Sequence, residues 1–135
     1  MIKDSERNDL INYRLTQAKN TISDVEILIK FEKYHSAVSR SYYGMFYCLL
    51  ALGLKYEFET SKHQQLIGWF NKNFIHSNKV DIKYGQIVRD AFKERQKSDY
   101  EVNVEFTKLQ VDEMFENLKE FVNEIEKIIS LNIQL

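Results

Sequence analysis

A stretch without charged residues, from Ser41 to Leu54, constrains the fold of this chain more than any other feature. It is too long for an ordinary strand and shorter than the about 20 residues that cross a bilayer as a helix. Together with the residues just before it, this stretch predicts a helix with two unlike sides. The small side chains are Ala37, Ser41, Gly44, Cys48 and Ala51, and the large ones are Val38, Tyr42, Met45, Leu49 and Leu52. A small stripe admits a close neighbouring helix and a large one fills a core. We therefore expect a surrounded central helix, whose close neighbour is either the first helix or the same helix of a second subunit.

The flanking sequence predicts further helices and no sheet. Apolar residues recur at helical spacing before, between and after the expected loops, and the chain contains no proline. The expected helices are about Ser5 to Glu32, Tyr34 to Gly53 or Leu54, one opening at Thr60 or Ser61, about Ile82 to Tyr100, and one from Thr107. The apolar positions of the first are Leu10, Tyr13, Ala18, Ile22, Val25 and Ile29. The sequence thus predicts an all-α fold, an up-and-down bundle of about five helices in a single domain over residues 1–135.

Two of these helices show the spacing of a capping box at their expected start. Ser61 is followed by Gln64, and Thr107 is followed by Gln110. In a capping box the hydroxyl and the amide side chain each bond the backbone of the other residue, which stabilises the first turn. We expect both boxes to form.

Several kinds of site are excluded by residue type. The four glycines are scattered, so a glycine-rich phosphate loop is absent, and His35, His63 and His76 fall in different elements. The single cysteine, Cys48, can neither pair internally nor join a zinc cluster. We therefore expect no metal and no cofactor. The polar N-terminus is unlike a secretion signal, and a lone cysteine suits a reducing, cytoplasmic setting without a membrane span.

Charge is unevenly distributed, although the net charge is only −1. Residues 62–97 contain 8 basic and 3 acidic side chains, whereas residues 98–135 contain 3 basic and 9 acidic ones. The basic segment can form an anion-binding surface, or the two segments can neutralise each other after folding.

The inward side of the fourth helix turns from apolar to charged along its length. Tyr84, Val88 and Ala91 are followed on the same side by Arg95 and Asp99. Arg40, on the central helix, has Tyr43, Gly44 and Tyr47 one and two turns further on. A buried guanidinium needs a partner. Arg40, Arg95 and Asp99 can therefore form a structural ion-pair network, or a pocket in which two guanidinium groups bind a phosphate.

Three segments, taken in order, resemble the signature of HEPN domains. The segment Tyr34–Phe46 contains an alanine, an arginine, paired tyrosines and a glycine at the start of the central helix. Ser61–His63 resembles the next block, and Arg95–Tyr100, which ends in Asp-Tyr, resembles the third. By motif the resemblance covers roughly Tyr34 to Tyr100, and by helix order the whole chain.

The resemblance implies a dimeric helical bundle from a bacterium or archaeon, acting as a toxin beside a minimal nucleotidyltransferase antitoxin. Active HEPN members are metal-independent ribonucleases. Their sequence motif is an arginine followed, after four to six intervening residues, by a histidine. Arg95 matches the arginine, but Tyr100 stands where the histidine is expected, and no histidine follows His76. A phenol, with a pKa near ~10, is a poor base at neutral pH.

His63 supplies the missing imidazole if the third helix packs near Arg95, within the chain or across a dimer. The sequence thus nominates Arg95, Tyr100 and His63 as catalytic residues, and Arg40, Tyr43, Lys97 and Asp99 as ligands of a phosphate or nucleotide. Tyr100 also loosely matches a tyrosine that is modified in related toxins. The expected function is a toxin-like protein, either a ribonuclease acting on RNA or a non-catalytic interaction or nucleotide-binding module.

Overall fold

The structure is a computed structural model that describes residues 2–135, and helices account for most of them. No strand occurs among these residues, which confirms the expected all-α class. The elements are α1 (Asp4–Lys30), α2 (Tyr34–Lys55), α3 (His63–Phe70), a π-helical turn η1 (Asn71–Ile75), α4 (Ile82–Tyr100) and α5 (Lys108–Ser130).

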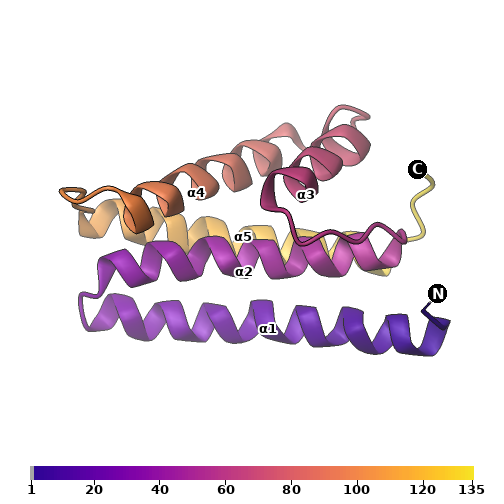
Figure 1. The fold of residues 1–135 in the computed structure, drawn as a ribbon, viewed down its shortest axis with the longest axis horizontal. Helices are drawn as coiled ribbons and strands as arrows, with labels where there is room; N and C mark the ends of the chain where they lie inside the picture. The colour runs from indigo at the N-terminus through magenta and orange to yellow at the C-terminus, as the bar shows by residue number, and fades with distance from the viewer. Residues whose placement is uncertain (1) are drawn as a thin grey trace.

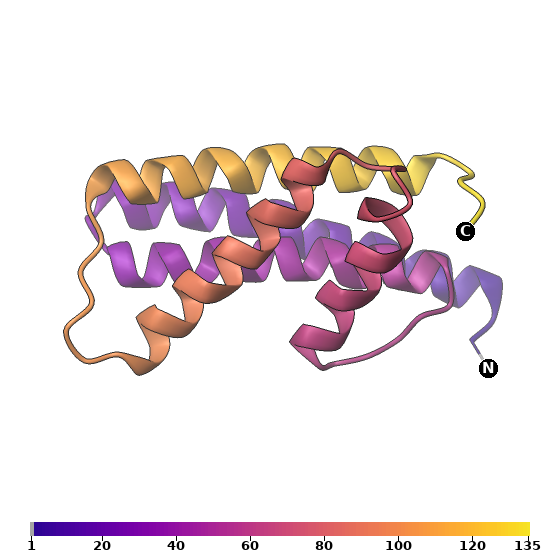
Figure 2. The ribbon, with the colours of Figure 1, turned by 90° about the horizontal axis from the view of Figure 1, so that it is seen from above.

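The four long helices alternate in direction and pack around α2 (Figure 1). Helices α1, α2 and α5 lie side by side, and α4 crosses α2 and α5 obliquely on the opposite side from α1. Seen from above, α3 and α4 diverge from their connection, so that the start of α3 and the end of α4 both lie over the α2 side of the bundle (Figure 2). The up-and-down bundle predicted from the sequence is confirmed.

The close neighbour of the small stripe on α2 is α1 of the same chain. All five small residues of the stripe are buried, and α1 and α2 form the most extensive helix pair. A Cβ atom on Gly44 would lie 2.7 Å from Leu118 Cδ1 of α5 and 3.1 Å from Thr21 Cγ2 of α1. Glycine at this position therefore permits the packing of three helices. The small stripe is covered within one subunit and is not left free for the α2 of another.

Two details of the sequence interpretation are wrong. The third helix begins at His63 rather than at Thr60 or Ser61, and no side-chain cap forms at its start. Instead the Thr60 hydroxyl accepts a hydrogen bond from the Lys62 backbone N–H at 3.1 Å.

On α1, Leu10 and Tyr13 are exposed, because the buried side is centred on Ile11, Ala18, Thr21 and Val25. The second capping box, between Thr107 and Gln110, forms as expected.

Candidate functional site

Arg95 lies on the inner side of α4 and is only 8% exposed. Its guanidinium carbon is 5.2, 5.4 and 5.5 Å from the ring centroids of Tyr42, Tyr43 and Phe92. Its Nη1 donates to Asp99 Oδ2 at 3.2 Å, whereas its buried Nε has no hydrogen-bond partner among residues 2–135. Aromatic faces stabilise a cation, but they do not use its N–H donors. Arg95 is thus a buried cation with hydrogen-bonding capacity to spare.

His63, in the first turn of α3, lies against the same aromatic rings. Its Nδ1 is 2.6 Å from the hydroxyl oxygen of Tyr42, and its ring stacks on Phe46 with the centroids 4.0 Å apart. Burial lowers the pKa of His63, and the positive charge of Arg95 lowers it further. Both effects favour the neutral form of the imidazole. The structure brings His63 near Arg95 within one chain, without a second subunit.

Tyr42 joins the two groups and was not nominated from the sequence. Its side chain is fully buried on α2, with Arg95 over its ring and His63 at its hydroxyl. Burial raises the pKa of Tyr42 well above its usual value, so that the phenol keeps its proton. Its position among the large side chains of α2 indicated a core residue, and the structure confirms that Tyr42 belongs to the core. The one sequence feature that pointed to a role in the site was the Tyr42–Tyr43 pair, which begins two residues after Arg40.

Arg40 lies at the edge of this cluster. Its guanidinium carbon is 5.8 Å from the ring centroid of Tyr43, the ring that Arg95 also contacts. It lines an open hollow of about 270 Å³ with Asp99 of α4; the rest of the lining is His35, Ser36, Ser39 and Ser98. No ion pair joins Arg40 to Asp99 among the described residues, so the predicted network is limited to Arg95 and Asp99.

The remaining nominated residues are exposed and lie outside the cluster. Lys97 is on the outer side of α4, 3.5 Å from Glu94. Tyr100, at the end of α4, is 74% exposed. Of the residues nominated from the sequence, the structure therefore gathers Arg95, His63, Tyr43 and Asp99 closely, places Arg40 beside them, and leaves Lys97 and Tyr100 at the surface.

Comparison with known proteins identifies the family of this chain. The family model of the HEPN domain matches residues 11–128, most of the chain. The chain belongs to the HEPN family. It is 34% identical to the "UPF0332 protein" of Thermotoga maritima over 93% of this chain and 95% of that protein. It is also 34% identical to "Putative toxin MJ0142" of Methanocaldococcus jannaschii, over 88% of this chain and 82% of that protein.

In this HEPN chain the side chains of the cluster are suited to holding an anion and moving a proton. A guanidinium fixed by aromatic rings stabilises negative charge, and a neutral imidazole accepts a proton near pH 7. No group of three or more potential metal ligands occurs within residues 2–135. Within residues 2–135, the helices lack the combination of length and hydropathy that a membrane-spanning segment needs.

Proposed function

We propose that this HEPN chain is a toxin-like, metal-independent endoribonuclease in which Arg95 and His63 act at one site. The observation that supports this most directly is Tyr42, whose ring lies under Arg95 and whose hydroxyl meets His63. The imidazole that the sequence motif lacks after Arg95 is thereby supplied from α3. The relative with the name "Putative toxin MJ0142" supports the toxin-like part of this proposal.

The proposed reaction is an internal transfer at a phosphodiester. The 2′-oxygen of one nucleotide bonds to the adjacent phosphorus, and the bond between phosphorus and the 5′-oxygen of the next nucleotide breaks. His63 takes the proton of the 2′-hydroxyl on Nε2, and the departing 5′-oxygen receives a proton from the same imidazole. The products are a 2′,3′-cyclic phosphate and a 5′-hydroxyl, and His63 returns to its neutral form.

Tyr42 is the positioning residue in this scheme. Nε2 of a neutral histidine can accept a proton only in the tautomer with the proton on Nδ1. In the tautomer that the proposal requires, that N–H donates to the hydroxyl oxygen of Tyr42, which lies 2.6 Å from Nδ1. The charge that develops on the phosphate is stabilised by Arg95.

In this proposal Asp99 controls access to Arg95, and Arg40 adds a second binding group for the strand. The Asp99 side chain is 32% exposed, so that it can turn to solvent and release Arg95 Nη1 to a phosphate. Arg40, beside Tyr43, places a second positive charge at the edge of the site. The two guanidinium groups then hold adjacent phosphates of one strand, with Tyr43 between them.

We further propose a homodimer and a minimal nucleotidyltransferase antitoxin as partners. Tyr100 and Lys97 support the second partner, because both are exposed at the end of α4 close to Asp99 in sequence. An exposed tyrosine is open to modification by an enzyme that transfers nucleotides, and Tyr100 directly follows Asp99, the partner of Arg95. Coexpression with the neighbouring reading frame followed by mass spectrometry of Tyr100 tests this part separately.

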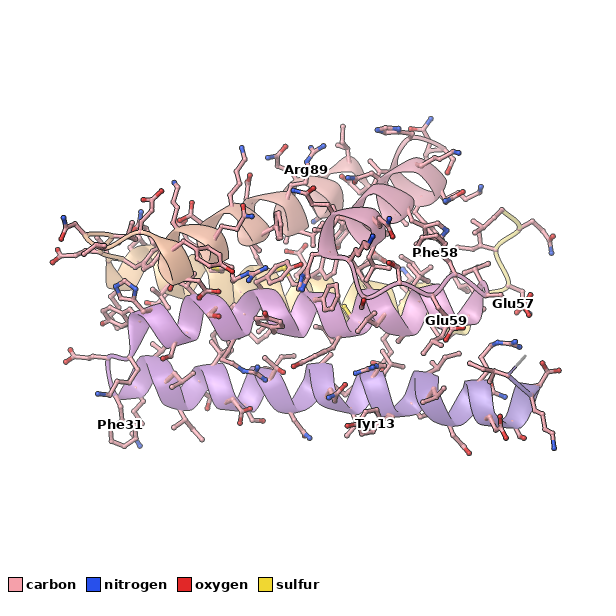
Figure 3. The ribbon with its side chains drawn as sticks, in the orientation of Figure 1. Tyr13, Phe31, Glu57, Phe58, Glu59 and Arg89 are labelled. Carbon is pink, nitrogen blue, oxygen red and sulfur yellow. The ribbon has the colours of Figure 1, made fainter. Side chains whose placement is uncertain are left out.

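The ribonuclease proposal is tested by incubating the purified protein with single-stranded RNA in the presence of a chelator. We expect cleavage that leaves cyclic phosphate ends, and we expect Arg95→Ala and His63→Gln each to lower its rate about 100-fold or more. Arg89→Ala is the matched control, because Arg89 is exposed on the outer side of α4 (Figure 3). Unchanged cleavage by Arg95→Ala contradicts the assignment.

The ion pair between Arg95 and Asp99 supports a second candidate, a non-catalytic binding module in which these residues only stabilise the bundle. Removing one partner of a fully buried pair costs about 3–5 kcal/mol, and partial exposure of Asp99 reduces this. If the chain is a binding module, we expect Arg95→Ala and Asp99→Ala to lose thermal stability and the wild type to show no cleavage. If the chain is a ribonuclease, we expect Arg95→Ala to lose cleavage at temperatures where the variant is still folded.

A further inference from the structure

An aromatic groove begins at the site and runs along α2 away from it. Its volume is about 480 Å³, and Tyr43, at its near end, is also the ring shared by Arg40 and Arg95. The lining residues are Arg14, Tyr43, Phe46, Tyr47, Leu50, Leu54, Phe58, Glu59, Thr60 and Ser61. Along α2, from position 43 to position 54, the groove is about 16 Å long, at 1.5 Å per residue.

The groove wall opposite α1 is held in place by a close backbone contact between Gly53 and Phe58. The Phe58 N–H donates to the Gly53 carbonyl at 2.8 Å, and a Cβ atom on Gly53 would lie 2.6 Å from the Phe58 carbonyl oxygen. Glycine therefore lets the segment after α2 fold back against the helix. Figure 3 shows Phe58 and Glu59 beside the C-terminal part of α2. The groove is formed before any ligand arrives, which lowers the entropic cost of binding.

Three properties of the groove match a nucleobase of single-stranded RNA. Four aromatic side chains line it, and bases of any sequence stack on aromatic rings. Arg14 on one side and the hydroxyls of Thr60 and Ser61 on the other offer donors and acceptors to a base edge or a ribose. A volume of about 480 Å³ is within the range of small-ligand sites, whereas the groove is too short for a long partner helix.

We propose that this groove binds a base of the RNA strand whose phosphate lies at Arg95. The inference rests on the proposed ribonuclease function and names its substrate as single-stranded RNA with an unstacked base. Glu59 carries a negative charge at the far rim, and the guanidinium groups of Arg40 and Arg95 lie near Tyr43. This polarity directs the phosphate to the Tyr43 end and the base toward Tyr47 and Phe58.

The chain contains its own reporter for such a ligand. Trp69, the single tryptophan, stacks almost parallel on Phe58, with ring centroids 5.0 Å apart and planes inclined by 5°. Phe58 lines the groove, so a base bound there changes the surroundings of this aromatic pair. Tryptophan fluorescence therefore measures occupancy without a label.

The test is a fluorescence titration with a short single-stranded DNA oligonucleotide, which has no 2′-hydroxyl and cannot be cleaved by the proposed reaction. The matched ligand is the same backbone with abasic sites, which keeps the phosphates and removes the bases. We expect saturable binding that is at least tenfold weaker for the abasic strand. We also expect Tyr47→Ala to weaken binding of the normal strand about tenfold, while Tyr47→Phe retains it. Phe31→Ala, an exposed aromatic near the opposite end of the molecule from Phe58 (Figure 3), leaves it unchanged.

Several outcomes overturn the inference. The first three are equal binding of the abasic strand, unchanged binding by Tyr47→Ala, and the absence of saturable binding. The fourth is a Tyr47→Ala variant that changes only the oligomeric state measured by light scattering, and this result assigns the groove to a second copy of the chain. The two proposals fail separately. If cleavage requires Arg95 and His63 but bases make no difference to binding, only the groove assignment fails. If bases bind through Tyr47 but Arg95→Ala cleaves normally, the ribonuclease assignment fails together with the placement of the phosphate at Arg95, and base binding in the groove stands alone.

Discussion

Replacing Tyr42 with phenylalanine removes one buried oxygen and keeps the ring on which Arg95 lies. The hydrogen bond of 2.6 Å to His63 Nδ1 is lost, whereas the ring centroids of residues 42 and 63, 5.5 Å apart, stay in contact. A net intramolecular hydrogen bond contributes about 0.5–1.5 kcal/mol. His63 is half-buried, so water can partly replace the lost partner, and we expect unfolding in urea to become easier by about 1 kcal/mol.

The same change acts on cleavage through the orientation of the imidazole. In the proposed mechanism the Tyr42 oxygen accepts from His63 Nδ1–H and so favours the tautomer with an unprotonated Nε2. Without that oxygen, about 1 kcal/mol of lost transition-state stabilisation lowers the rate constant about fivefold. We expect kcat to fall with KM nearly unchanged in a fluorogenic RNA cleavage assay.

The matched control is Tyr84→Phe, a buried tyrosine near the start of the same helix as Arg95. Its hydroxyl donates to Glu120 at 3.4 Å, remote from the cluster. This variant loses a hydroxyl without touching His63, so its kcat remains that of the wild type. Equal kcat values for the wild type and Tyr42→Phe would refute the positioning role, because the ring contact and the fold are both preserved.

Three further predictions concern the bundle. Gly44→Ala adds a Cβ atom 2.7 Å from Leu118 Cδ1. The cost of overpacking, about 1–3 kcal/mol, outweighs the gain of about 1 kcal/mol in helix propensity, so we expect urea denaturation to show a net loss of stability. A gain in stability would contradict the close packing at this position. Thr107→Ala removes the hydroxyl that accepts from the Gln110 N–H and lowers the free energy of unfolding by about 1 kcal/mol, whereas no change in melting temperature means that the box contributes nothing. Burial raises the pKa of the Cys48 thiol well above its usual value, so iodoacetamide modifies it only after unfolding, and rapid labelling of the folded protein is the contrary result.

Helix order and the central role of α2 were predictable because they depend on local periodicity and side-chain size. Helix α4 matched its predicted bounds, and the Thr107 box formed, since both depend on residues a few positions apart. The inward position of Arg95 followed from the same periodicity.

Contacts between distant segments were not predictable in this way. The meeting of His63 with Tyr42, 21 residues apart, depends on how α3 returns over α2, and the sequence left open whether it occurs within a chain. The start of α3 was misplaced because Thr60 bonds the Lys62 backbone and not the third residue of the helix. The identity of the helix against the small stripe was equally undetermined, since α1 or a second copy satisfies the same pattern.

The acid dependence of stability follows from the lowered pKa of His63. Above the unfolded value of about 6.5 the imidazole is neutral in both states and contributes nothing. As the pH falls through that value, the unfolded chain takes up a proton that the folded site resists, so the free energy of unfolding decreases.

The central claim, that Arg95 and His63 share one site around Tyr42, is tested most directly by NMR titration of the His63 imidazole. The chain has three histidines, so His35→Gln and His76→Gln variants assign the signal. The structure predicts a pKa below 6.5 that rises in Arg95→Ala, because the charge of Arg95 is one cause of the lowering. A pKa at or above 6.5, or a value that Arg95→Ala does not change, contradicts the shared site.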